Sequence, residues 1–386
     1  MIDRNTVDDG YNTLLGLWNE TRVNNNTNDC LPNVFYGFWH AGNTLDTFMD
    51  YLGHAQPANY QQTAAMLGAQ GVDIFKQVIK VDPTTSPLND TPPTTAWWDD
   101  YGWWGIAFLK VRFLTNDQKY LHAAKVCWHF MDKGGRQYTG GPGSQGGTWN
   151  HDPAAHPPGI QNVITNALFL ILSGRLYTNT GDSQYLAGAK AQYAWFEYQL
   201  SHGAKHDVPG SPTAWLIRQL PLTPGQGLWT GDQGALLGGL SAFRQCVLNS
   251  NPGLAATLQG MCDAIVAGVK RSDEMVASPP WAPGTKVLHE KQAPSDPVDW
   301  RFDLNGSVGK GVVIRYLAAY FLTRDDFIDG NAAAVSHYWK PGYIFPDSWV
   351  DDASEKMNND GCPNLGKLTQ QCSGQDAMNA LLRPAS

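Results

Sequence analysis

The segment NVITNALFLILSGRLYTNTGD, Asn162–Asp182, decides the fold class of this chain. From Ile164 to Leu176 it is apolar almost all round and rich in small residues, a pattern typical of a helix that is buried on every side. Asp182 can cap a second helix, and Tyr185 three residues later can pack back on the first one. The segment therefore predicts a helical hairpin whose first helix is buried.

This hairpin pattern recurs along the chain. The same cap and aromatic residue appear as Asp117 with Tyr120 and as Asp325 with Phe327. Further apolar segments are Gly234–Phe243 and Val312–Phe321, and segments with a polar face are Gln118–Lys133 and Ser183–Gln199. Inner apolar helices and outer amphipathic ones, in about six pairs, predict an all-α (α/α)6 toroid over 1–386 as a single domain. A right-handed solenoid is the competing geometry.

Helix-length apolar stretches predict about a dozen helices, and strand patterns are scarce. We expect the helices to begin near Val7, Gly42, Tyr60, Asp99, Gln118, Gln161, Ser183, Gly231, Gly253, Val308, Ala332 and Gln375. Long Gly/Pro-rich loops lie between them at Asp82–Thr95, Gly134–Gly159, Val208–Trp229 and Ser278–Pro297. Loops this long in a compact protein are usually functional.

Composition narrows the class of partner. The net charge of -8, without a Lys/Arg run, argues against nucleic acid or an anionic membrane. The chain holds 15 Trp, and an indole suits the flat apolar face of a sugar. No stretch of about 18 apolar residues predicts a membrane span. We expect a neutral polysaccharide or oligosaccharide as the partner.

Cysteines and glycosylation sequons indicate the compartment. The six Cys include Cys246 with Cys262 and Cys362 with Cys372, which are close enough in sequence to form local bridges. Sequons begin at Asn19, Asn25, Asn89 and Asn305. We interpret the chain as a secreted, monomeric glycoprotein from which a signal peptide has been removed; a cytosolic protein is the alternative.

The segment WWDDYGWW, Trp97–Trp104, carries the candidate chemistry. Of the Asp–Asp pairs in the chain, only Asp99–Asp100 is flanked by two Trp pairs. Desolvation by the indoles and the neighbouring charge should raise one pKa, leaving a protonated acid beside an ionised carboxylate, as glycosidic cleavage requires. Carboxyls about 5–5.5 Å apart imply retention and about 6.5–9.5 Å inversion, and adjacency favours the shorter distance. The structural alternative is a charge cluster at a helix N-terminus.

Other motifs carry no comparable signal. Gly141–Gly146 matches G-x-G-x-x-G, but no apolar strand precedes it. His151, Asp152 and His156 fit no common metal-ligand spacing. We therefore expect neither a metal nor another cofactor.

The Trp97–Trp104 segment resembles the catalytic signature of glycoside hydrolase family 76, the endo-α-1,6-mannanases. Further segments similar to that family are Phe38–Asn43, Gly146–Trp149, Asn162–Asp182, Asp232–Leu240 and Lys310–Leu317. The resemblance implies an (α/α)6 barrel with a cleft at one end, retaining hydrolysis of α-1,6-mannan, and no metal. It implies Asp99 as the nucleophile and Asp100 as the general acid/base. The chain departs from the family in having Asp232 where Asn is common and Asn150 where a second Trp follows Trp149.

We therefore predict a retaining, endo-acting α-1,6-mannanase with Asp99 and Asp100 as catalytic residues. The predicted substrate-binding residues are the platforms Trp39, Trp104 and Trp149 and the hydrogen-bonding residues Asn43, Asn166, Asp232 and Gln233. A cell-wall transglycosidase, a catalytically silent carbohydrate-binding protein and another α/α-toroid enzyme, such as a sugar epimerase or an unsaturated-uronide hydrolase, are the alternatives.

Overall fold

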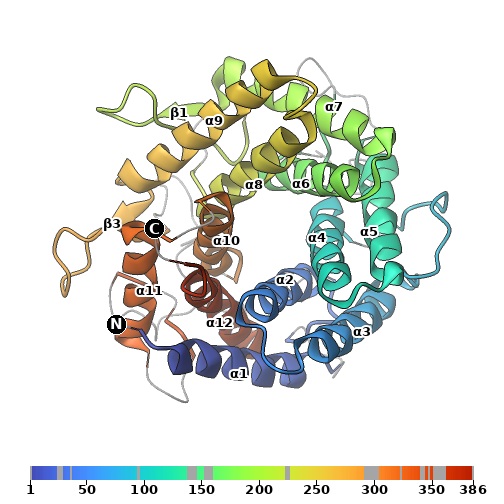
Figure 1. Ribbon diagram of the computed structural model, residues 1–386, viewed down its shortest axis with the longest axis horizontal. Helices are drawn as coiled ribbons and strands as arrows, with labels where there is room; N and C mark the ends of the chain where they lie inside the picture. The colour runs from blue at the N-terminus through green and yellow to red at the C-terminus, as the bar shows by residue number, and fades with distance from the viewer. Residues whose placement is uncertain are drawn as a thin grey trace.

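A computed structural model describes residues 2–23, 29–34, 37–93, 96–136, 146–151, 160–221, 227–290, 304–321, 324–339, 344–346, 348–350 and 362–384. Within them, twelve α-helices form two concentric rings (Figure 1). The inner ring consists of α2 (Phe38–Ala55), α4 (Trp98–Thr115), α6 (Val163–Thr180), α8 (Thr230–Val247), α10 (Leu304–Phe321) and α12 (Pro363–Ala380). The outer ring consists of α1 (Arg4–Thr21), α3 (Tyr60–Ile79), α5 (Gln118–Phe130), α7 (Ser183–Gln199), α9 (Pro252–Arg271) and α11 (Asp326–Tyr338). The predicted all-α (α/α)6 toroid is confirmed.

Short elements decorate these rings. The π-helical turns η1 (Met131–Gly135) and η2 (Leu200–Ala204) continue α5 and α7. Strand β1 (Lys205–Asp207) pairs antiparallel with β2 (Trp215–Ile217), and β3 (Val276–Ala277) with β4 (Val287–Leu288). Parts of the predicted loops, and the sequon residue Asn25, lie outside the described residues.

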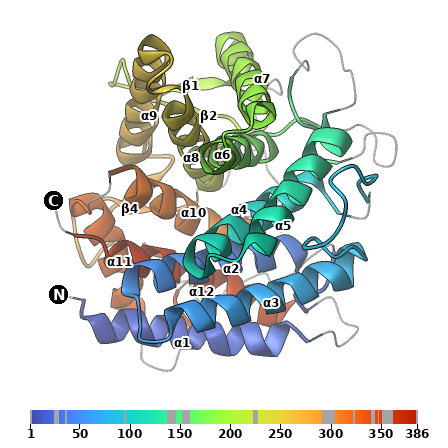
Figure 2. The same ribbon diagram turned by 45° about the vertical axis from the view of Figure 1, so that its right-hand side comes forward.

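The helical hairpins follow the predicted division between inner and outer helices. Every residue of α6 from Val163 to Gly174 is buried, whereas α7 alternates between buried and exposed residues. The predicted caps are present, because the side chains of Asp117, Asp182 and Asp325 each accept a hydrogen bond from a backbone N–H in the first turn that follows. Figure 2 shows α1 and α3 outside α12 and α2.

The last inner helix closes the ring. α12 packs between α10 and α2, and α1 covers its outer side. Asp29 completes this junction, because its carboxylate accepts hydrogen bonds from the backbone N–H groups of Asn364 and Leu365, both at 2.9 Å, in the first turn of α12. The N-terminal and C-terminal parts of the chain are thus neighbours in the toroid.

Two predicted helix starts are wrong. α12 begins at Pro363 rather than near Gln375, and α11 begins at Asp326 rather than near Ala332. α12 has little apolar periodicity because many of its buried residues are polar. The other predicted starts lie within about one helical turn of the observed ones.

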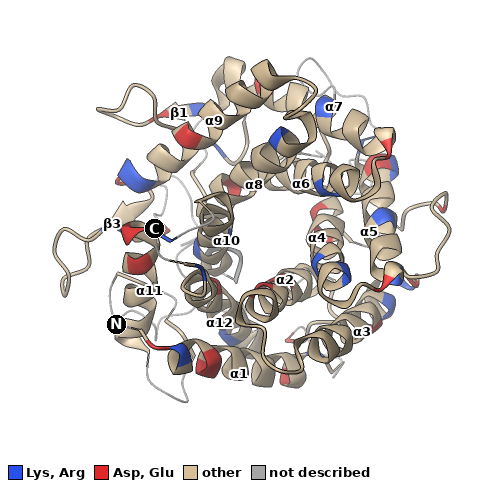
Figure 3. Cartoon of the chain, viewed as in Figure 1, with Lys and Arg blue, Asp and Glu red and all other residues tan. Residues whose placement is uncertain are grey.

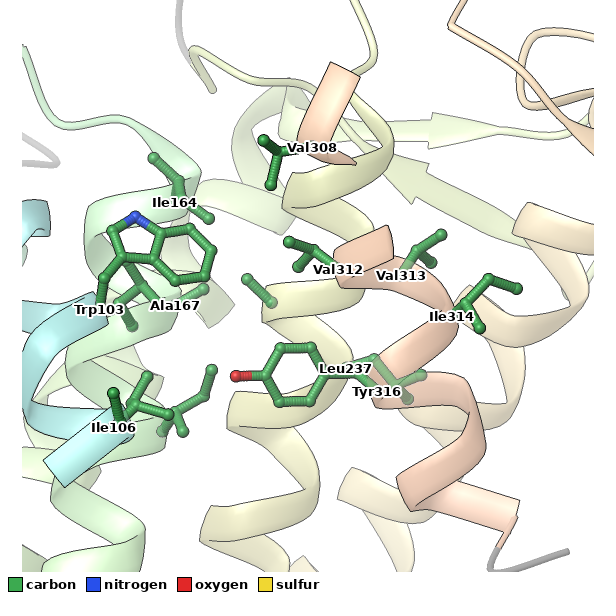
Figure 4. Packing of buried hydrophobic residues seen from close by; sticks show 14 of the residues in the cluster. Trp103, Ile106, Ile164, Ala167, Leu237, Val308, Val312, Val313, Ile314 and Tyr316 are labelled. Atoms are coloured by element: carbon green, nitrogen blue, oxygen red, sulfur yellow. The ribbon is translucent and has the colours of Figure 1, made fainter. Parts of the chain in front are cut away.

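Side chains fill the centre of the ring. Figure 4 shows Trp103 of α4 and Ile164 of α6 facing Val308 and Val312 of α10 across the axis. These side chains are at most 6% exposed. The inner helices also approach closely: a Cβ on Gly234 of α8 would lie 2.5 Å from the Cα of Val313, so only glycine fits there.

Charged residues of both signs are spread over the described helices. Figure 3 shows acidic and basic residues distributed around both rings. Helix α9 has the length and composition of a membrane-crossing segment, but core helices share these properties, and its apolar side packs on α8.

Candidate active site

A pocket of about 290 Å3 lies where the N-terminal ends of inner helices meet. Hairpin topology makes successive inner helices run in the same direction, so their first turns share one end of the toroid. The lining residues are Val34, Trp39, Trp97, Asp99, Asp100, Trp103, Asn150, Ile160, Asn162, Ile164, Gln219 and Trp229. Asp99, Asp100 and Trp39 of the predicted site residues are therefore brought together.

Local hydrogen bonds hold the Asp pair at the mouth of α4. Trp97 is the N-cap residue, and its backbone N–H donates to Oδ2 of Asp100 at 3.0 Å. The backbone N–H of Trp98 donates to the carbonyl of Asn150 at 2.8 Å, which ties the helix to the loop before α6. Gly134 of η1 lies against the Trp98 ring, where a Cβ would come within 2.2 Å of it. The catalytic candidates thus sit on a helix whose first turn is anchored on two sides.

Burial strongly perturbs both carboxyls. Desolvation raises the pKa of Asp99 to about 7, although backbone N–H groups of Asp99 and Asp100 lower it. Asp100 is only 5% exposed, and desolvation followed by the charge of Asp99 raises its pKa well above the usual range. The pair therefore titrates so that Asp100 holds its proton more tightly than Asp99. One acid and one carboxylate coexist near neutral pH.

Aromatic rings form the walls of this pocket. The Trp39 and Trp103 rings lie 5.6 Å apart, centroid to centroid. Trp97 is 41% exposed, and its ring meets that of His151 edge-on at 4.8 Å. Rigid rings with an apolar face and a polar edge suit a sugar.

Two polar atoms at this pocket have no hydrogen-bond partner within the described part of the chain. They are Oδ1 of Asn150 and Nε1 of Trp229. Leaving such atoms unpaired costs free energy, about 1–3 kcal/mol each. Both atoms are almost completely covered by the surrounding protein.

Several residues predicted to contact the sugar lie outside the pocket lining, because their side chains are buried and bonded within the protein. Trp104 is 0% exposed, and its indole N–H donates to the carbonyl of Phe38 at 3.0 Å. Asn43 is 1% exposed and accepts from Arg315 at 2.9 Å. Both belong to the packing between inner helices.

The remaining amides are also structural. Asn166 binds the backbone N–H and carbonyl of Thr148 at 2.7 and 2.9 Å, which holds the loop before α6. Gln233 binds the backbone N–H and carbonyl of Ile217, both at 2.8 Å, which holds β2 against α8. Neither side chain is exposed to a ligand, since both are 0% exposed.

The last two predictions also fall outside the pocket lining. Asp232 is fully buried in the first turn of α8, and burial and Glu290 raise its pKa well above the usual range. It is 0% exposed and does not line the pocket, so the structure does not bring it together with the Asp pair. Trp149 packs half-buried against the core, next to the lining residue Asn150.

Sequence reasoning missed most of the lining. Trp97 and Asn162 are the N-cap residues of α4 and α6, and Trp229 that of α8. The signal was present, because residues that precede every second helix of a toroid gather at one end. Trp103 and Gln219 carry no comparable signal.

Fold and site together define an (α/α)6 toroid protein with an aromatic-lined dicarboxylate pocket at one mouth. The model of glycosyl hydrolase family 76 matches residues 5–242, which is more than half of the chain. The chain belongs to glycosyl hydrolase family 76, a family of glycoside hydrolases.

Solved structures share the fold along nearly the whole chain. An inactive variant of an α-1,6-mannanase of Salegentibacter sp., in complex with α-1,6-mannotetrose, has a TM-score of 0.67 at 18% identity, covering 98% of this chain and 99% of that one. Dfg5 of Chaetomium thermophilum, in complex with glucosamine, has a TM-score of 0.65 at 14% identity, covering 100% and 93%. An α-mannanase of Bacteroides thetaiotaomicron has a TM-score of 0.63 at 13% identity, covering 97% and 95%. Among curated protein sequences nothing matches.

Proposed function

We propose that this protein is a retaining, endo-acting α-1,6-mannanase in which Asp99 is the nucleophile and Asp100 the general acid/base. The observation that carries the proposal is the placement of both carboxyls in one Trp-walled pocket, with the pKa of Asp100 raised further than that of Asp99. In the inactive variant of the Salegentibacter mannanase, two consecutive aspartates are replaced by alanine.

The reaction divides into two displacements at one anomeric carbon. Asp99 attacks that carbon while Asp100 donates its proton to the departing glycosidic oxygen, which gives a covalent glycosyl-enzyme. Asp100, now ionised, accepts a proton from water as the water oxygen attacks and releases Asp99. Asn150 and Trp229 line the pocket beside the reacting sugar. Secretion and a monomeric state belong to the same proposal.

Incubation with linear α-1,6-mannan tests this function. We expect oligosaccharides and new reducing ends from the wild type, and loss of both from Asp99→Asn and Asp100→Asn. Asp326→Asn is a matched control, because Asp326 is the second residue of another Asp–Asp pair and is exposed in the first turn of α11. Proton NMR of the first product distinguishes retention from inversion. Release of mannan fragments by Asp99→Asn at the wild-type rate would contradict the assignment.

A transglycosidase is the second candidate. A sugar hydroxyl can replace water in the second displacement without any change in the first. The likeness to Dfg5 is nearly as high as that to the mannanase, with TM-scores of 0.65 and 0.67. Added α-1,6-mannobiose would then yield products longer than the donor, whereas a hydrolase yields shorter ones.

A further inference from the structure

A second pocket, of about 380 Å3, opens among the C-terminal halves of the inner helices. It lies at the mouth opposite the Asp pair, because the inner helices run in the same direction. Charged residues line it: Asp50, Lys110, Arg175, Arg315 and Arg383. Nothing in the proposed reaction uses this pocket.

Two of its four cations are already neutralised. Arg315 binds Asp46 and Asp376, both at 2.6 Å. Lys110 binds Asp46 at 2.6 Å and Asp50 at 2.7 Å. The negative ends of the helix dipoles at this mouth also stabilise nearby cations. The carboxylates Asp46, Asp50 and Asp376 add to that stabilisation.

Arg175 and Arg383 remain, so the four cations at this pocket outnumber the three carboxylates Asp46, Asp50 and Asp376 by one. Among the residues that the structure describes, neither makes an ion pair within 4.0 Å. The Arg175 guanidinium lies 6.0 Å from the centre of the Tyr316 ring. Burial lowers the pKa of Arg383, although Asp50 raises it. A pocket with a surplus cation favours an anion.

A buried hydroxyl points the same way. Tyr316 is 3% exposed, and its hydroxyl has no hydrogen-bond partner in the described part of the chain. Figure 4 shows this hydroxyl directed away from α10 toward the centre of the ring. Ser241, Asn179 and Gln245 add further polar groups to the lining. An unpaired buried hydroxyl is costly unless a ligand or water completes it.

We propose that this second pocket binds an oxyanion, a phosphate or carboxylate group carried on a small hydroxylated body, through Arg175, Arg383 and Tyr316. Each planar guanidinium group would donate two parallel hydrogen bonds to the anion, and the Tyr316 hydroxyl would donate one more. Binding at this mouth is independent of the Asp99–Asp100 chemistry.

Calorimetric titration of the full chain tests the site with named probes. The probes are glucose 6-phosphate and inorganic phosphate for a phosphate group, sodium glucuronate for a carboxylate group, and glucose as the neutral comparison. We expect glucose 6-phosphate or glucuronate to bind at least about tenfold more tightly than glucose, with affinity falling as salt rises. The preferred probe identifies which anion the pocket takes.

Variants locate the site. Arg175→Gln should raise the Kd about tenfold or more, because a charge-assisted contact is lost. Tyr316→Phe keeps the ring and should raise the Kd about threefold. This milder variant tests the site even if Arg175→Gln does not fold. Arg271→Gln is the matched control, since Arg271 is exposed at the end of α9 and lines neither pocket. Asp99→Asn should bind the anion as the wild type does.

Three results would overturn the proposal. They are no binding of any anionic probe up to about 10 mM, equal affinity for glucose and glucose 6-phosphate, and binding that Arg175→Gln and Tyr316→Phe both leave unchanged. Absence of mannan cleavage by the wild-type protein, together with intact anion binding, would instead count against the proposed function alone.

Discussion

The Asp100 carboxylate accepts a hydrogen bond from the backbone N–H of Trp97 at 3.0 Å while it lies beside Asp99 in a desolvated pocket. The bond favours the ionised carboxylate, but burial and the Asp99 charge outweigh it and raise the pKa of Asp100. The folded protein therefore retains a proton there that the unfolded chain releases.

The first prediction concerns stability. Above about pH 4 the unfolded chain has ionised carboxyls, so holding Asp100 protonated costs folding free energy that increases as the pH rises. Asp100→Asn should raise the free energy of unfolding at pH 7.5 by about 1 kcal/mol or more, at the cost of activity. Denaturant unfolding at pH 4 and pH 7.5 measures the difference, which should shrink at the lower pH. An equal change at both pH values would exclude this origin.

The pH dependence of catalysis follows from the same pair. Because the pKa of Asp99 is about 7, kcat/KM for a soluble mannan oligosaccharide should rise as the pH increases toward that value. It should fall again at higher pH, when Asp100 loses its proton. Asp326→Asn should leave the profile unchanged. A rate that is flat from about pH 5 to 9 would contradict the assigned protonation states.

Trp97 should act on substrate binding rather than on folding. Its ring is 41% exposed at the pocket, so Trp97→Ala removes sugar-stacking area and little core packing. We expect KM to rise about fivefold or more with a small change in Tm. Trp281→Ala is a suitable control, since Trp281 stacks on His337 away from the pocket. A large loss of Tm with unchanged KM would reverse this assignment.

Gln233 should act on folding rather than on substrate binding. Gln233→Leu leaves the backbone N–H and carbonyl of Ile217 without their buried partner, which should cost about 2–4 kcal/mol of stability. KM at a temperature where the variant is folded should stay within about twofold of the wild type. Chemical denaturation and steady-state kinetics measure the two effects. A rise in KM alone would restore the role expected from the sequence.

Arg315 joins three inner helices, because it binds Asp46 of α2 and Asp376 of α12 from α10. Arg315→Met would leave both carboxylates buried without their cation and should cost about 3–5 kcal/mol. Lys205→Met removes an exposed pair with Asp207 and should cost under about 1 kcal/mol. Equal unfolding midpoints for the two variants would show that the buried ion pairs contribute no more to stability than the exposed pair does.

The parts of the fold that local pattern controls were predictable. An apolar surface all round marks α6 as an inner helix, and an Asp before a new helix marks its cap. α12 was largely missed because Gln371 and Asn379 look solvent-facing in sequence. In the toroid they bind the backbone carbonyls of Gly10 and Thr47. Such partners lie hundreds of residues away, where no local pattern reports them.

The residues of the candidate site also differ in whether the local sequence predicts them. Asp99 and Asp100 were predictable because their own neighbours create the apolar setting. Trp97 and Asn162 were missed because their signal is not local: it appears only when the N-cap positions of alternate helices are combined with the geometry of the toroid. The backbone contacts of buried amides such as Asn166 were not predicted, because a sequence does not tell whether an amide binds a ligand or a backbone.

The position of α12 bears on how the protein is made. This helix fills the gap between α2 and α10, and its Gln371 completes a hydrogen bond to Gly10 of α1. During synthesis, the side of α2 that binds α12 through Thr47 therefore has no partner until a helix more than 300 residues further along the chain has left the ribosome. A nascent chain shorter than this cannot close the ring, so closure depends on contacts between the two ends of the sequence and comes last.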